Sequence, residues 1–232
     1  MEQRSAADPQ EASDRELAAM MAAGNHRAFE VLMRRHNQVL YRTARSIVKD
    51  DTEAEDVVQE AYLLAYRNAA GFRGEASMAT WLTRIVVNEA SGRLRKARRR
   101  ADLIALVSGA IGNADPTEDT MAEPESGAGP EAPDTALLRA EARCLIEGRI
   151  DALPDTLRTV FVLRAIEDMS VQETAAALGM PEATVRSRYF RARGLLREAL
   201  ARDFDLGVAA AFSFDGERCD RIVARVLARL RS

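Results

Sequence analysis

Residues 170–193 read SVQETAAALGMPEATVRSRYFRAR, and this stretch carries the signals of two short helices joined by a turn. Ser170, followed three positions later by Glu173, forms a capping box that fixes the start of the first helix. Gly179 stands where that helix must end, because glycine enters the left-handed backbone region at little cost. Pro181 suits the first position of the next helix. The pattern predicts a helix-turn-helix, whose second helix enters the major groove of DNA.

The second of these helices has one apolar face and one basic face. Its apolar residues recur every three or four positions and are expected to face a core: Val185, Tyr189, Ala192 and Leu196. An arginine off this face can read guanine bidentately, and Phe190 can contact a thymine methyl group. Other arginines hold phosphates. The candidate DNA-binding residues are Thr184, Arg186, Ser187, Arg188, Phe190, Arg191 and Arg193. The plainer alternative is a surface helix with solvated arginines, and the capping box, glycine turn and proline count against it.

The composition of the chain limits which fold classes and which classes of protein are possible. The chain has 232 residues, which is enough for two small domains, and no alternating strand pattern recurs. We therefore expect an all-α protein. Its two cysteines and two histidines are isolated, so we expect neither a metal site nor a cofactor. No nucleophile–base pair or phosphate-binding glycine loop is present, so we do not expect an enzyme. The sequence shows no signal peptide or membrane-spanning run, which predicts a cytoplasmic protein without membrane insertion.

A formal net charge of −3 conceals strong segregation of charge along the chain. Residues 91–100 hold six basic and no acidic residues, whereas residues 101–136 hold eight acidic and no basic residues. The second stretch also holds four prolines, a composition that buries too little apolar surface to order itself. We therefore expect helical domains at 14–100 and 137–200, a flexible acidic linker at 101–136 and a C-terminal extension at 201–232. Within the linker, the apolar cluster at 103–107 is expected to form a short docked segment.

The first domain contains a helix with two distinct faces. A capping box formed by Thr52 and Glu55 predicts its start, and it is expected to run to about Arg67. Its buried stripe is predicted to be Val57, Ala61, Leu64 and Ala65. A second stripe is acidic and polar with one exposed leucine, and consists of Asp56, Gln59, Glu60 and Leu63. Such a stripe suits a protein partner with a basic helical surface, and the alternative is an ordinary solvated face.

A loop bounded by glycines precedes a second helix, which Ser77 is expected to cap and which should end near Arg100. Its inward residues are predicted to be Leu82, Ile85 and Val86, and its polar stripe is Arg84, Asn88, Ser91 and Arg95. A basic surface of this kind suits single-stranded DNA, because arginines bind phosphates while unstacked bases find pockets or aromatic faces. Trp81 fits either a stacking platform or a core anchor.

Three stretches, in this order, resemble motifs of bacterial RNA polymerase sigma factors. Residues 56–67, DVVQEAYLLAYR, resemble the helix that binds core polymerase. Residues 72–88 resemble the loop and helix that recognise the minus-ten element, and residues 153–193 resemble the domain that recognises the minus-thirty-five element. The resemblance covers about 15–100 and 135–200, and the two-domain form is similar to the extracytoplasmic-function (ECF) group of the sigma-70 family.

The resemblance implies a factor that binds core RNA polymerase, directs it to promoters with both elements and promotes DNA melting. It implies three kinds of partner: promoter DNA, core polymerase and an anti-sigma factor. The stripe formed by Asp56, Gln59 and Glu60 would face the clamp coiled coil of the largest subunit, and the second domain would meet the flap of the second-largest subunit. The loop would hold a base flipped from the non-template strand. The implied minus-ten residues are Phe72, Arg73, Glu75, Ser77, Met78, Trp81, Arg84, Asn88 and Arg95.

Two questions stay open at this level. The extension at 201–232 contains an amphipathic pattern, Ile222, Val223, Val226, Leu227 and Leu230, that fits either a regulatory element or a structural buttress of the second domain. The alternative function is a stand-alone helix-turn-helix regulator that binds duplex DNA as a dimer. That alternative leaves the first domain unexplained.

Overall fold

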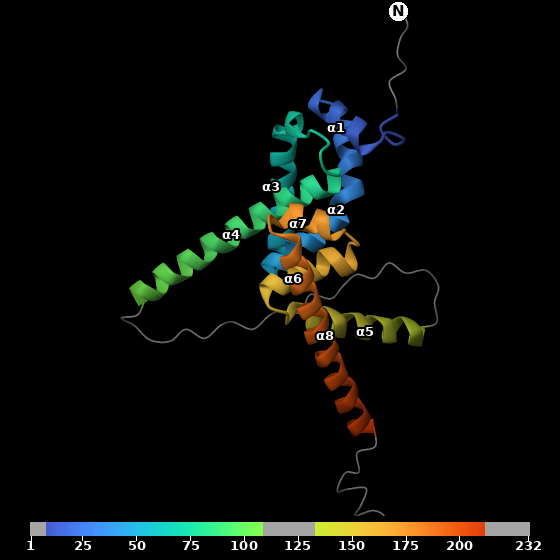
Figure 1. The fold of residues 1–232 in the computed structure, drawn as a ribbon, viewed down its shortest axis with the longest axis vertical. Helices are drawn as coiled ribbons and strands as arrows, with labels where there is room; N and C mark the ends of the chain where they lie inside the picture. The colour runs from blue at the N-terminus through green and yellow to red at the C-terminus, as the bar shows by residue number, and fades with distance from the viewer. Residues whose placement is uncertain (1–7, 109–132, 212–232) are drawn as a thin grey trace, which may run out of the picture.

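The structure is a computed structural model that describes residues 8–108 and 133–211. Every regular element within these two ranges is helical, which confirms the predicted fold class (Figure 1). The N-terminal bundle comprises α1 (Asp14–Ala22), α2 (His26–Val48), α3 (Asp51–Arg67), the 3₁₀ turn η1 (Ala69–Gly71) and α4 (Met78–Ser108). The C-terminal bundle comprises α5 (Pro133–Asp151), α6 (Asp155–Phe161), the π turn η2 (Val162–Ile166), α7 (Val171–Leu178) and α8 (Glu182–Ala211).

Polar side chains cap the helices of the N-terminal bundle. Ser13 and Glu16 form a capping box at α1, and Asn25 caps α2. At α3 the cap is Asp50, whose carboxylate accepts a hydrogen bond from the backbone N–H of Glu53 at 2.7 Å. The capping box predicted at Thr52 and Glu55 is therefore wrong. Asp50 comes earlier in the chain, and its negative charge suits the positive end of the helix.

The core of the N-terminal bundle joins all four helices. Its largest fully buried apolar side chains are Leu17, Met21, Leu32, Leu40, Val57, Met78, Leu82 and Val86. The predicted inner stripe of α3 is buried at Val57, Ala61 and Ala65 and half-buried at Leu64. Tyr62 is also buried, with its hydroxyl donating to the Met33 carbonyl at 3.1 Å, and burial raises the pKa of its phenol. The sequence pattern did not single out this tyrosine.

The helix-turn-helix is present as predicted. Ser170 and Glu173 form both hydrogen bonds of the capping box at α7, and Gly179 ends that helix at φ 62°. Helix α8 begins at Glu182, one residue later than expected. Pro181 is the residue just before the helix, and its carbonyl accepts hydrogen bonds from the backbone N–H groups of Thr184 and Val185. Two small clusters anchor the motif: Leu153, Phe161 and Ala192, and Leu163, Met169 and Ala177.

Two helices run further than the sequence predicted. Helix α4 continues through Ser108 instead of ending near Arg100, because residues 101–108 contain no glycine or proline. Ile104 is 55% exposed on it, so the expected docking of the 103–107 cluster is not seen at that residue. Helix α8 continues to Ala211. Most of the predicted linker and tail, at 109–132 and 212–232, lies outside the described residues.

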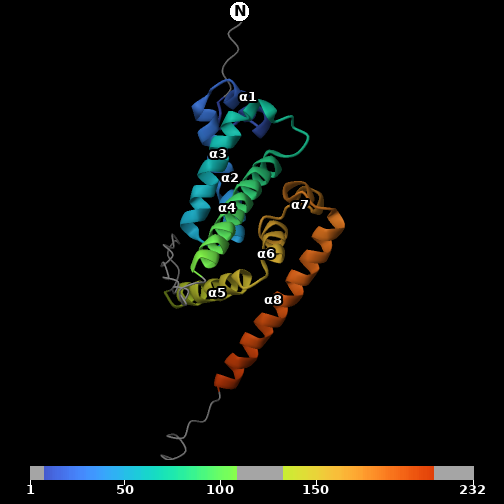
Figure 2. The same ribbon diagram turned by 90° about the vertical axis from the view of Figure 1, so that its left-hand side faces the viewer.

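The two bundles lie against each other. Helix α6 packs on α2, and α7 packs on α4, as the two perpendicular views show (Figures 1 and 2). In Figure 1 the last turns of α4 and the far half of α8 extend away from this contact. Across the two described ranges, no helix has the length and apolar character needed to cross a membrane.

Candidate DNA- and polymerase-binding surfaces

Helix α8 presents the basic surface predicted for a recognition helix. Val185 and Ala192 are fully buried on its inner face, with Tyr189 and Leu196 packed beside them. On the outer face, Phe190 is 80% exposed. The outer face also carries Arg186, Ser187, Arg191 and Arg193, all exposed, while Thr184 and Arg188 are half-buried at its edges. The predicted division of this helix into an apolar and a basic face is therefore correct.

The arginines of α8 differ in what they contact. Arg186 pairs with Glu182 one turn earlier, and Arg188 donates to the sulfur of Met180 at 3.7 Å. The Arg193 guanidinium lies 5.7 Å from the centre of the Tyr189 ring. Arg191 forms no ion pair or hydrogen bond within the described part of the chain. Arg191 is thus the arginine of this face that can meet an external acceptor without breaking an internal contact.

The loop before α4 is fixed by a helix cap, a glycine turn and an aromatic contact. Ser77 caps α4 by accepting from the Thr80 N–H at 3.2 Å, as predicted, and Gly74 adopts φ 73°, a conformation that strains any residue with a side chain. The rings of Phe72 and Trp81 lie 5.5 Å apart. A cavity of about 270 Å³ opens beside the loop, lined by Arg15, Ala18, Ala19, Ala22, Ala69, Ala70, Phe72, Arg73 and Gly74.

The predicted minus-ten residues fall into two groups. Six of them are exposed, three in the loop and three on α4: Arg73, Glu75, Ser77, Arg84, Asn88 and Arg95. Phe72 and Trp81 are half-buried against the core, so Trp81 is at least partly the core anchor that the sequence allowed. Met78 is only 2% exposed within that core, and its side chain is not on the surface. Residue 78 is the first residue of α4, and its position one helical turn before Leu82 places it on the buried stripe.

The acidic stripe on α3 is open to solvent. Asp56 and Gln59 are exposed, Glu60 is half-buried, and Leu63 is 49% exposed. A cavity of about 640 Å³ runs beside Gln59 between α3 and α2, with an apolar floor that includes Met33, Val58 and Tyr62. Neither bundle covers this stripe in the structure.

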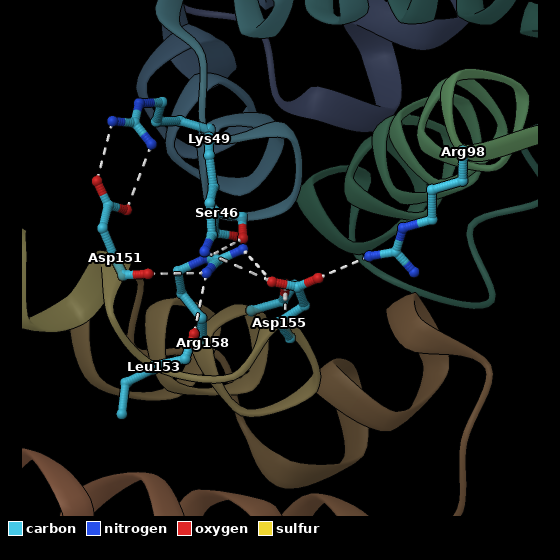
Figure 3. Close-up of polar contacts among 9 residues, drawn as sticks. Ser46, Lys49, Arg98, Asp151, Leu153, Asp155 and Arg158 are labelled. Carbon is cyan, nitrogen blue, oxygen red and sulfur yellow. Dashed lines mark hydrogen bonds and ion pairs between the residues drawn. The ribbon is translucent and has the colours of Figure 1, made fainter. Parts of the chain in front are cut away.

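A polar contact between the bundles was missed at the sequence level. The Arg158 side chain is fully buried, and its Nε donates to the Ser46 carbonyl of α2 at 2.5 Å (Figure 3). Asp155 lies beside it and also meets Arg98 of α4 at 2.9 Å (Figure 3). The signal that could have found Arg158 is an arginine inside the apolar run LRTVFVL, where the helix periodicity requires burial.

Two family descriptions match this chain. Residues 32–100 match Sigma-70 region 2, and residues 145–196 match Sigma-70, region 4. The first match contains the acidic stripe, the loop and most of α4, and the second contains the helix-turn-helix.

Related proteins agree with both matches. The RNA polymerase sigma-H factor of Pseudomonas aeruginosa is 34% identical over 194 residues, or 81% of this chain and 93% of that protein. The ECF RNA polymerase sigma factor SigM of Mycobacterium tuberculosis is 36% identical over 190 residues, or 82% and 86%.

Two solved structures share the arrangement of helices. CnrH, in its complex with the cytosolic domain of CnrY, superposes with a TM-score of 0.54 at 30% identity over 82% of this chain and 98% of that one. The sigma factor RpoE of Bartonella quintana, in complex with the anti-sigma factor NepR, shares the fold with a TM-score of 0.57 at 22% identity, over 75% and 96%. The chain belongs to the extracytoplasmic-function group of sigma-70 family RNA polymerase sigma factors, initiation factors that bind core polymerase and direct it to promoters without catalysing a reaction themselves.

Proposed function

We propose that the two promoter elements are read by separate surfaces of this chain, one on each bundle, while the acidic stripe of α3 binds core polymerase. The observation that supports this division best is the placement of three exposed surfaces on three different helices. The basic face lies on α8, the arginine-bearing surface on α4 and its loop, and the acidic stripe on α3.

The minus-thirty-five element is assigned to α8. Exposed arginines at the outer face suit guanine edges and phosphates, and Phe190 offers an apolar contact to a thymine methyl group. Arg191 is the main candidate for base recognition because it has no internal partner among the described residues. Arg186 must first release Glu182, so it is expected to contribute less.

The minus-ten strand is assigned to the loop and α4. Five of the nine residues that line the cavity beside the loop are alanines, and the lining also includes Phe72 and two arginines, Arg15 and Arg73. Such a lining suits a flat unstacked base followed by a phosphate. Arg84, Asn88 and Arg95 continue along α4 as the path for the following nucleotides. Met78 is left out of this surface, because its side chain fills the core.

Core polymerase is assigned to the stripe formed by Asp56, Gln59, Glu60 and Leu63. Its two carboxylates fit the basic helical surface of the clamp coiled coil, and Leu63 supplies an exposed apolar contact. The C-terminal bundle would in turn meet the flap of the second-largest subunit. Because core polymerase works in the cytoplasm, we place the chain there.

An anti-sigma factor is proposed as a further partner. The support is that CnrH and the Bartonella RpoE are both seen in complexes, the latter with a protein named as an anti-sigma factor. Both superpose on most of this chain. Their complexes therefore offer a ready comparison for any partner recovered with this protein.

Reconstitution tests the whole assignment. The full chain is mixed with purified bacterial core polymerase, and a promoter library with randomised minus-ten and minus-thirty-five positions is transcribed. We expect holoenzyme to form, transcripts to require both elements, and permanganate to detect unpaired thymines near minus ten. Duplex binding as a dimer, with no effect of core polymerase, would instead favour the stand-alone regulator.

A further inference from the structure

One face of α1 lines the cavity beside the loop. Four of the lining residues recur at i, i+3, i+4 and i+7, which is the spacing of a single helix face: Arg15, Ala18, Ala19 and Ala22. The other lining residues belong to η1 and the loop, and α1 packs directly on η1. The match to Sigma-70 region 2 begins at residue 32, so α1 lies outside it. A part of the chain beyond the matched region therefore shapes the cavity assigned to the unstacked base.

Helix α1 is anchored to the rest of its bundle. Leu17 and Met21 are fully buried on its inner side. At the first turn, the Asp14 carboxylate accepts a hydrogen bond from Arg35 at 3.2 Å and lies 3.0 Å from Nε2 of His36, and both partners belong to α2. A side chain on an anchored helix is placed more precisely than one on a loop. Helix α1 therefore presents its outer face to the cavity from a fixed backbone.

The polar groups of the cavity lining are two guanidinium groups. Among the nine lining residues, only Arg15 and Arg73 have polar side chains. Both are exposed, and within the part of the chain that the structure describes neither forms an ion pair or a hydrogen bond. An arginine side chain donates hydrogen bonds and accepts none. The side chains of the cavity thus offer donors and apolar surface, and a bound base must supply the acceptors.

The four DNA bases differ in how their acceptors are arranged. Guanine has two neighbouring acceptors, O6 and N7, and unpaired cytosine also has two, N3 and O2. In adenine and thymine a donor stands between the acceptors. A guanidinium group presents two parallel N–H groups, which match two neighbouring acceptors better than an alternating pattern. A lining whose side chains only donate therefore favours cytosine or guanine over adenine and thymine.

The two arginines are suited to different tasks. Reading a base requires a fixed donor geometry, which the anchored α1 gives to Arg15, whereas Arg73 lies in the loop before α4. We propose that Arg15 reads the unstacked base of the minus-ten strand as cytosine or guanine, while Arg73 binds a neighbouring phosphate. This makes α1 a helix that determines specificity. The proposal rests on the assignment of the minus-ten strand to this cavity.

The base preference of the holoenzyme tests the proposal. The full chain is assembled with core polymerase on promoter templates whose minus-ten region is already unpaired, and the non-template strand carries each of the four bases in turn at each minus-ten position. At one position we expect cytosine or guanine to exceed adenine and thymine roughly 5- to 150-fold in transcript yield, which is the effect of one bidentate contact. A preference for adenine or thymine at every position would overturn the proposal.

Three arginine variants separate base reading from simple charge. Arg15→Ala should lose the preference at that position, and Arg15→Lys should also lose it while keeping the strand affinity, because lysine retains the charge without the planar fork. Arg73→Ala should weaken binding of all four bases about equally and keep the preference. The matched control is Arg27→Ala, which removes an exposed arginine from α2 and should change neither quantity. A full preference in Arg15→Lys, or its loss in Arg73→Ala alone, would refute the role of Arg15.

Filling the cavity tests whether a base enters it. Ala19 is exposed on the face of α1 that lines the cavity, and leucine is nearly as good a helix former as alanine. Ala19→Leu should therefore keep the fold, as circular dichroism checks, but lower transcript yield from all four templates. Ala142→Leu, at an exposed position of α5, is the control of equal size and should leave the yield unchanged. Equal yields from the Ala19 variant and the unmodified protein would show that the cavity stays empty.

The outcomes also distinguish this proposal from the assignment on which it rests. Transcription that ignores the base at every minus-ten position would count against the minus-ten surface itself. A normal minus-ten preference that the Arg15 variants leave intact would instead overturn only the role of α1.

Discussion

Arg93 of α4 and Glu53 of α3 form an ion pair 3.2 Å long, which joins the helix assigned to the opened strand to the helix assigned to polymerase. Arg93 also meets Glu89 on its own helix at 2.9 Å and lies 4.0 Å from Asp56. Its hydrogen bond to Glu89 is the largest cause of the raised pKa of its guanidinium, burial opposes the charge, and Glu53 adds to the increase. The arginine therefore stays charged, and it links the acidic stripe to α4.

Reversing the charge of the acidic stripe should abolish holoenzyme assembly. In the double variant Asp56→Arg with Glu60→Arg, two arginines would face a basic partner, and the arginine at 56 would also repel Arg93. Like charges placed together at an interface cost several kcal/mol, so we expect core polymerase to bind at least roughly 100-fold more weakly in a fluorescence titration.

Glu11→Arg is the control for this prediction, because Glu11 is exposed on the same bundle away from α3. The affinity of the Glu11→Arg variant for core polymerase should match that of the unmodified protein. Circular dichroism should show that both variants keep their helices. Wild-type affinity in the double variant would refute α3 as the docking surface.

Arg191→Ala should relax recognition of the minus-thirty-five element. Loss of one bidentate base contact costs about 1–3 kcal/mol of discrimination at a single base pair. Arg202→Ala is the matched control, since Arg202 is exposed on α8 two to three turns beyond the recognition face. Transcription competition between promoters that differ at one minus-thirty-five position measures the effect. An unchanged preference in the Arg191 variant would exclude Arg191 from base recognition.

Met78 should act through stability and not through DNA. Because its side chain fills the core, Met78→Ala is expected to lower the free energy of unfolding by about 2–5 kcal/mol, whereas Met78→Leu should cost less than about 1.5 kcal/mol. Urea denaturation measures both. Promoter opening by the Met78→Leu variant should equal that of the unmodified protein, and an altered minus-ten preference would show that residue 78 does reach a base.

Elements with strong local signals were predicted well from the sequence. The capping box at Ser170, the glycine turn at Gly179 and the inner face of α8 all depend on contacts within about four residues, so the sequence displays them directly. Helix ends were less certain. The cap at Asp50 was missed because several neighbouring polar residues are suitable caps. Helix α4 continues beyond its basic stretch because a run of charged residues does not end a helix.

The contact between the bundles could not be predicted in this way. Arg158 and Ser46 are 112 residues apart, and no periodicity relates them. The exposure of Trp81 and Met78 likewise depends on how α4 is rotated against α2 and α3. Two apolar residues in neighbouring turns of a helix can look equally suited to the core in the sequence, although only one of them is fully buried.

We expect Asp155 to make the stability of the protein depend on pH in acid. Burial acts to raise the pKa of this carboxyl, but the hydrogen bond and charge of Arg158, followed by Lys49 and Arg98, lower it below its ordinary value of 3.8. A depressed carboxyl pKa contributes stability above its unfolded value, and the contribution is lost as the pH falls through the folded value. We therefore expect that contribution to be present at about pH 5 and to disappear below about pH 3.8. Urea midpoints across this range should fall more steeply for the unmodified protein than for Asp155→Asn, and parallel slopes would exclude Asp155 as the sensor.

We expect the two parts of the C-terminal extension, before and after Ala211, to have different roles. Within the described part of it, the Asp203 side chain is largely buried and pairs with Arg149 of α5, whose Nε donates at 2.7 Å, and this pair links the second half of α8 to α5. Deleting residues 201–232 removes this pair, and we expect it to lower the free energy of unfolding by about 1–3 kcal/mol, as should Asp203→Ala alone. Deleting only 212–232 should leave the unfolding midpoint unchanged, so that any altered response to a regulator in this shorter variant can be attributed to the tail. If both deletions destabilise the bundle equally, residues 212–232 act as a structural buttress and the regulatory alternative fails.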